Sequence, residues 1–193
     1  MKHEALENML NCLGRALFRE KEKVTVDLLG SAALMLGYGC WPNANDIDAR
    51  WSPEDSFVLG PLIADIGQKR NHAKGSHWMN CDIADIVHHQ GTWSKSVDYG
   101  YLNVRIPTPE FLMSILVQAL YTCEAGNTEY PPFGKVAAQC KALADSQKWK
   151  KEDIAREVTP FLQKGIPPAC DEWLDRIFAT KGDFCKRLEM LEP

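Results

Sequence analysis

The chain has 193 residues, with 22 lysines and arginines against 26 aspartates and glutamates, and a formal net charge of −4. Hydrophobic residues make up 45% and charged residues 25%, a composition typical of one globular domain, or of a core with a small appendage. The mild acidity argues against a broad basic surface for duplex DNA. No apolar run reaches the roughly 18 residues that a membrane span needs. The first residues mix acidic and apolar side chains, which predicts an amphipathic helix and not a signal peptide, so a cytoplasmic chain is the default expectation.

The seven cysteines are widely spaced and form no CxxC pair. Disulfides are not expected in a chain without a secretory signal. Zinc ligands usually come as close pairs in the sequence, and such pairs are absent here. Most of the cysteines are therefore expected to pack as small core hydrophobes.

Hydrophobic spacing predicts a mixed α/β section followed by a helical one. In chain order it predicts a helix over 3–22, a strand over 24–29, a short helix over 31–36, a strand over 46–51, a helix over 54–70 that Gly60-Pro61 can split, short extended pieces within 78–87, and a strand over 101–106. After a break at Pro107–Pro109 it predicts helices near 110–121, 134–146, 150–163, 168–179 and 183–190. The expected class is α+β: a small mixed sheet flanked by helices over 1–106, and a helical section over 107–193 packed on it as a C-terminal bundle.

Residues 26–51 carry the features that indicate chemistry. Gly30 permits a positive φ and a close approach of a ligand to the backbone. The free N–H groups at the start of the helix at Ser31 favour a phosphate. Asp46 and Asp48 lie two apart on a predicted strand, so both carboxylates share one face. Paired carboxylates suit Mg²⁺, and a phosphate-binding helix end facing them is what two-metal nucleotidyl transfer needs.

The order strand, Gly30-Ser31, helix, loop and Asp46-Ile47-Asp48 strand resembles the minimal nucleotidyltransferase superfamily, which has the DNA polymerase β-like fold. More narrowly, LLGSAALMLGYG followed by NDIDARWSP resembles the bacterial AbiEii-type nucleotidyltransferases of toxin–antitoxin and abortive-infection systems, which act in phage defence.

The resemblance implies transfer of a nucleoside monophosphate from an NTP to a hydroxyl of RNA, a protein or a small molecule. Asp46 and Asp48 would then hold two Mg²⁺ ions, and Gly30 and Ser31 would hold the β- and γ-phosphates. For the third catalytic carboxylate Asp85 is preferred over Asp82, with two ordinary surface acids as the alternative.

Several positions depart from the family pattern. Leu29 stands where related sequences usually carry a second glycine. Pro42 and Ala44 stand where an arginine and a threonine often precede the acidic pair, and residues 111–118 lack a lysine. These departures fit an alternative function, in which a degenerate member of the family binds a partner protein or nucleic acid, as an antitoxin-like protein or a mobile-element inhibitor.

Other residues near this segment allow two interpretations. The tryptophans at 41 and 51 either stack on a base or lie in the core, and the core is favoured. Arg105 either faces a cleft or forms a structural ion pair. A basic run in a polar loop either contacts an acceptor or triphosphate or is simply solvated: Lys69, Arg70, His72 and Lys74.

Overall fold

The computed structural model describes residues 1–82, 91–124, 133–162, 174–175 and 178. These residues belong to two compact units, the first ending at Thr108 and the second beginning at Pro109. The division lies between Thr108 and Pro109. Within the described ranges, no helix combines the length and the apolarity that a membrane crossing requires.

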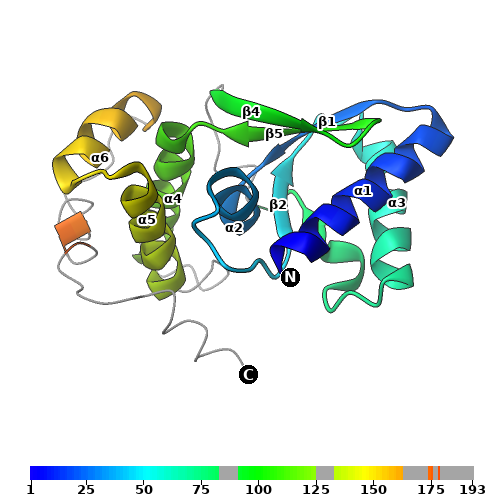
Figure 1. Ribbon diagram of the computed structural model, residues 1–193, viewed down its shortest axis with the longest axis horizontal. Helices are drawn as coiled ribbons and strands as arrows, with labels where there is room; N and C mark the ends of the chain where they lie inside the picture. The colour runs from blue at the N-terminus through cyan, green and yellow to red at the C-terminus, as the bar shows by residue number, and fades with distance from the viewer. Residues whose placement is uncertain (83–90, 125–132, 163–173, 176–177, 179–193) are drawn as a thin grey trace. The chain divides into compact units, whose positions relative to one another are not determined.

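The first unit combines helices with a mixed sheet, as the α+β prediction expects. Its elements are α1 (His3–Glu20), β1 (Val24–Leu28), α2 (Gly30–Ala33), a π-helical turn (Leu34–Tyr38), β2 (Ile47–Arg50), α3 (Ser56–Lys69), a 3-10 turn (Gly75–His77), β3 (Met79–Asn80), β4 (Trp93–Asp98) and β5 (Leu102–Pro107). In the described part of the chain, five strands form one sheet in the order β3-β2-β1-β5-β4 (Figure 1). The central strand β1 runs antiparallel to β2 and parallel to β5.

The sheet has one apolar and one polar face because side chains alternate along its strands. On the apolar face Val26, Ile47 and Val104 are fully buried. Helix α1 contacts β5 and α3, and α2 contacts β2. Helix α1 contributes a stripe of buried leucines to this core: Leu6, Leu10, Leu13 and Leu17. The opposite face of the three central strands therefore presents their polar side chains.

Helix α3 and strand β4 differ from the predictions. The Gly60-Pro61 pair does not split α3, which continues as one helix with Pro61 inside it. Proline removes the N–H that would bond to the carbonyl of Phe57; Phe57 is 87% exposed, so water can reach this first turn. Strand β4 was not predicted, because most of its residues are exposed and its sequence carries no apolar alternation.

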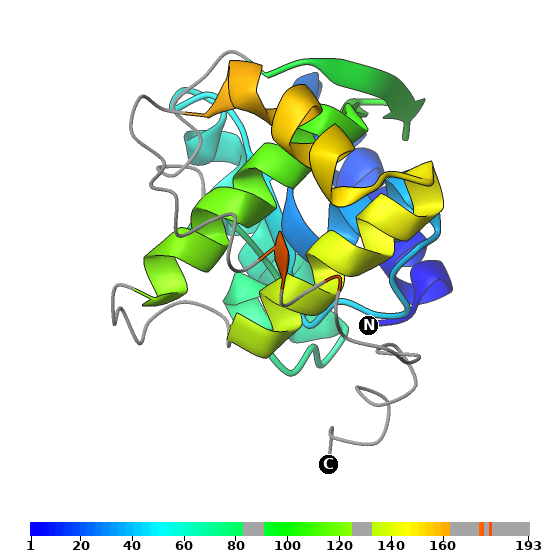
Figure 2. The ribbon, with the colours of Figure 1, turned by 90° about the vertical axis from the view of Figure 1, so that its left-hand side faces the viewer.

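The second unit is helical in its described residues. Helix α4 (Pro109–Glu124) packs against α5 (Phe133–Gln147) and α6 (Lys151–Val158), which a 3-10 turn (Thr159–Phe161) follows (Figure 2). The ring centroids of Phe111 and Phe161 lie 5.7 Å apart. The α-helix predicted over 150–163 ends earlier, at Val158, and continues as the 3-10 turn, because Pro160 has no N–H to donate to the carbonyl of Arg156. Apart from 174–175 and 178, the helices predicted at 168–179 and 183–190 lie outside the described residues.

Candidate functional site

The corner between β1 and α2 lies beside Asp48. Gly30 begins α2 with a φ of +51°, a left-handed conformation that glycine adopts at little cost. A Cβ added to Gly30 would lie 2.6 Å from Oδ2 of Asp48. The Leu29 N–H donates to the backbone carbonyl of Asp48 over 2.8 Å. The chain therefore leaves room for a carboxylate against the backbone of this corner, and a side chain at position 30 would displace it.

The two predicted metal ligands lie at the start of β2. Asp46 comes immediately before the strand and Asp48 is its second residue. Both are partly exposed, while Ile47 between them is fully buried. This alternation is what the two-residue spacing predicts for carboxylates on one face. Oδ2 of Asp46 lies 3.8 Å from Nζ of Lys74, whose side chain is 51% exposed, so Asp46 already faces a cation that can move away.

Only part of the predicted basic loop reaches this corner. Lys69 pairs with Asp65 within α3, at 2.7 Å, and Arg70 donates to the Cys12 sulfur. The pKa of His72 is lowered, mainly by burial and further by the amino terminus and Lys74, although Asp46 acts to raise it. His72 is therefore neutral at pH 7, and Lys74 is the member of the run that carries charge to Asp46.

The remaining predicted residues have varied positions. Ser31 is buried next to Gly30, with 6% exposure. Asp85, the preferred third carboxylate, lies outside the described residues. Asp82 is exposed, and its backbone N–H donates to Oδ1 of Asn80. The described residues contain no group of three or more acidic, histidine or cysteine side chains suited to a metal ion.

The two tryptophans that flank the acidic strand differ from each other. Trp41 is 5% exposed, as the core interpretation predicted, and its indole Nε1 has no hydrogen-bond partner within the described part of the chain. Trp51 is partly exposed, and its Nε1 donates to Oγ of Ser56 over 3.0 Å. Trp51 therefore keeps surface available to a ligand, whereas Trp41 does not.

A row of charged residues crosses the polar face of the sheet. Asp27 on β1 stands in register with Arg50 on β2 and with Arg105 on β5. Nε and Nη2 of Arg50 donate to Oδ2 of Asp27 over 3.3 and 3.1 Å, and Nε of Arg105 donates to Oδ1 over 2.5 Å. Asp27 is 4% exposed. One buried carboxylate thus holds two guanidinium groups.

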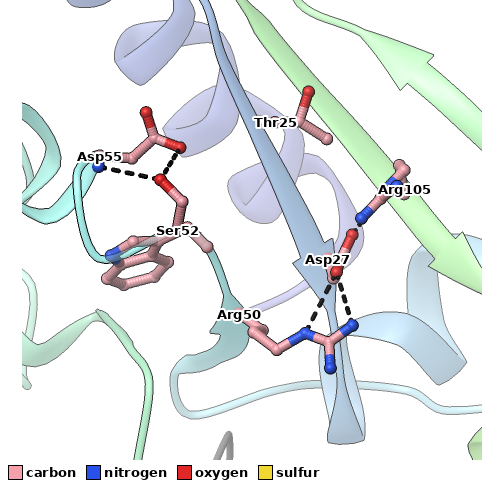
Figure 3. A pocket seen from close by; sticks show the side chains of 7 residues that line it. Thr25, Asp27, Arg50, Ser52, Asp55 and Arg105 are labelled. Atoms are coloured by element: carbon pink, nitrogen blue, oxygen red, sulfur yellow. Dashed lines mark hydrogen bonds and ion pairs between the residues drawn. The ribbon is translucent and has the colours of Figure 1, made fainter. Parts of the chain in front are cut away.

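This row forms the floor of an open hollow of about 420 Å³. Figure 3 shows Asp27 between the two arginines, with Ser52 and Asp55 on the other side of the hollow. Its lining residues come from β1, β2, β5 and the segment that follows β2: Thr25, Asp27, Arg50, Trp51, Ser52, Asp55 and Arg105. Arg105 therefore combines the two interpretations offered for it, since it forms an ion pair and also lines a cavity.

Asp27 was not among the predicted site residues. A signal for it exists, because an aspartate interrupts the apolar stretch of the 24–29 strand and a buried carboxylate needs partners. The partners themselves were harder to foresee. Arg50 lies two positions beyond Asp48 and shares its face, but Arg105 is 78 residues from Asp27 in the sequence.

Compared with known proteins, the chain matches no family model, no curated protein and no solved structure.

Proposed function

We propose that the chain is a metal-dependent nucleotidyltransferase with a nucleotidyltransferase-like sheet and a C-terminal helical bundle. It transfers a nucleoside monophosphate from an NTP to a hydroxyl of RNA, a protein or a small molecule, in the cytoplasm, as a component of toxin–antitoxin or phage-defence systems. The observation that carries the proposal is the contact between the Gly30 corner and the Asp48 carboxylate. It supports the combination that the sequence motif requires, a phosphate-accepting backbone beside an acidic strand.

The donor set at this corner fits magnesium. Carboxylate oxygens are the ligands that Mg²⁺ prefers, usually together with substrate phosphates. Asp46 and Asp48 would hold the metal, which supplies charge neutralisation on the reacting phosphates. Lys74 already occupies a position near Asp46, at a long 3.8 Å and with half of its side chain exposed. Because an exposed pair of this kind contributes little stability, its separation does not oppose metal binding strongly.

In this proposal the phosphates bind at the same corner. The backbone of Gly30 and the hydroxyl of Ser31 would hold the β- and γ-phosphates. The acceptor hydroxyl oxygen attacks the α-phosphorus, the bond to the β-phosphate oxygen breaks, and pyrophosphate leaves with the bonding electron pair. The hydroxyl proton passes to a carboxylate, for which Asp85 is the proposed residue.

Transfer of label from each α-³²P-labelled NTP tests this function. The full chain is incubated with Mg²⁺ and transfer RNA, and both the RNA and the protein are examined for label. We expect label on one of them, and no label with the double variant Asp46→Asn/Asp48→Asn. The matched control is Glu22→Gln, which removes the charge of an acidic residue that is exposed on the same unit. Equal labelling by the double variant contradicts the proposal, and absence of label with all four nucleotides contradicts transfer to transfer RNA or to the chain itself.

The departures from the family pattern at Pro42, Ala44 and residues 111–118 favour the alternative function, because polar and basic groups that related sequences carry there are absent. In that case the chain acts by binding a partner protein or nucleic acid without turnover. The double variant would then bind its RNA or protein partner as the wild type does, and neither would transfer label.

A further inference from the structure

The two arginines on the floor of the hollow have hydrogen-bond donors to spare. A guanidinium carries five N–H donors and is always charged. Arg50 commits Nε and Nη2 to Asp27, and Arg105 commits Nε. In the described part of the chain, Nη1 of Arg50 and both Nη atoms of Arg105 have no protein partner. Their side chains are 27% and 38% exposed, so these donors remain open to a ligand.

The charges of this row do not balance. Two guanidinium groups share the single carboxylate of Asp27, so the row has one positive charge in excess. Asp55, which also lines the hollow, balances this charge from the opposite side. Asp27 holds its two partners on the strands that flank β1, and a phosphate group has enough acceptor oxygens to take hydrogen bonds from both guanidinium groups.

An aromatic ring also orients both guanidinium groups. The ring centroid of Trp93 lies 4.5 Å from Cζ of Arg105 and 5.8 Å from Cζ of Arg50. Cation–π contacts at this distance restrict the side chains. Asp27 and Trp93 thus hold the arginines in place before any ligand binds. This lowers the entropic cost of binding.

The other side of the hollow has a different chemistry. Oδ2 of Asp55 accepts a hydrogen bond from the Ser52 hydroxyl over 2.8 Å, and Thr25 adds a second hydroxyl to the lining. Trp51 supplies an aromatic surface. Across from the cationic floor, the hollow therefore offers acceptors for ligand hydroxyl groups and a ring on which a base can stack.

We propose that the hollow binds a phosphomonoester, with the phosphate held by Arg50 and Arg105. The nucleotide unit that carries it is either a free nucleoside monophosphate or the phosphorylated end of an RNA chain. Binding at this place needs no metal. Arg50 lies two residues beyond Asp48 on β2, which corresponds to about 7 Å along a strand. A phosphate in the hollow would therefore lie next to the proposed metal ligands, and its role as part of the acceptor rests on the proposed function.

Calorimetric titrations in EDTA test the inference. The probes are adenosine 5′-monophosphate against adenosine, and a 5′-phosphorylated RNA trinucleotide against the same RNA without the phosphate. We expect binding that depends on the phosphate in at least one pair. Arg105→Gln should weaken it by about tenfold or more, the loss expected for hydrogen bonds to a charged group. Arg105→Lys, which keeps a cation beside Asp27 but not the planar fork, should also weaken it.

Two controls make the result specific. Arg15→Gln removes an exposed arginine on α1 that does not line the hollow, and it should bind as the wild type does. The variant Asp46→Asn/Asp48→Asn should keep its phosphate-dependent binding in EDTA, even though it loses nucleotidyl transfer. The pair of probes that shows phosphate-dependent binding, either the adenosine pair or the RNA pair, identifies the ligand as a free nucleoside monophosphate or as an RNA end. Binding that is equal with and without the phosphate, or equal in Arg105→Gln and Arg15→Gln, overturns the inference.

Discussion

Replacing Gly30 with alanine tests the corner on which the proposed function depends. At a φ of +51° the new Cβ would lie 2.6 Å from Oδ2 of Asp48. A non-glycine residue in this left-handed region costs about 1–2 kcal/mol. To reach 3.4 Å, where ordinary van der Waals contact begins, the carboxylate must also move back by the difference, 3.4 − 2.6 = 0.8 Å. A carboxylate is the movable end of its side chain, so this shift adds little to the cost in stability but displaces a proposed metal ligand.

Gly39 offers a matched control. Its φ is +61°, and a Cβ there would meet nothing within 4 Å. Gly39→Ala should therefore lose the same 1–2 kcal/mol from the free energy of unfolding without moving any ligand. Urea unfolding measures the two stabilities, and the rise in melting temperature with Mg²⁺ and an NTP reports binding to the folded state.

The two variants should be similar in stability and different in nucleotide binding. We expect Gly39→Ala to keep the rise in melting temperature and Gly30→Ala to lose most of it. If both variants respond to the nucleotide equally, the position of the Asp48 carboxylate beside Gly30 has no part in binding. If Gly30→Ala is as stable as the wild type, the left-handed conformation assigned to Gly30 is wrong.

Three further predictions concern the fold. Gly14→Ala places a Cβ 2.1 Å from the carbonyl oxygen of Tyr99, and should lower the free energy of unfolding in urea by about 1–3 kcal/mol; an unchanged free energy would contradict this close approach. Burial raises the pKa of Tyr99 to about 12, with a contribution from Glu7. The stability that this shift provides is complete below pH 10, the ordinary pKa, and is lost as the pH rises to 12. Tyr99→Phe should flatten this loss in denaturation curves between pH 9 and 12, and an unchanged slope would contradict it. Asp27→Asn should cost about 1–3 kcal/mol in urea unfolding, because it removes the buried counter-charge of two arginines that remain partly solvated; no loss would mean that the row contributes nothing to the fold.

The parts of the fold that were predicted correctly are those in which burial imposes a sequence period. The leucines of α1 repeat at helical spacing because that stripe is buried. The alternation around Ile47 placed β2 correctly for the same reason. Strand β4 was missed because pairing with β5 along one edge holds it in place, and this requires no apolar pattern.

The candidate site was predictable only where its residues are close in the sequence. Gly30 and Asp48 are 18 positions apart within one motif, and their contact follows from pairing between β1 and β2. The charged row depends on β5 returning beside β1, which brings Arg105 to Asp27. No local sequence pattern predicts that pairing of strands. Asp27 and its second arginine could therefore be identified as a site only from the structure.

Calorimetric titration of each NTP into the wild-type chain, Asp48→Asn and Glu22→Gln, with Mg²⁺ and again with EDTA, measures whether nucleotide binding depends on the carboxylate beside Gly30. We expect binding that requires Mg²⁺, that disappears in Asp48→Asn, and that persists in Glu22→Gln. Equal binding by wild type and Asp48→Asn in Mg²⁺, or no binding of any NTP by the wild type, would contradict the assignment of a metal–nucleotide site to the Gly30 corner.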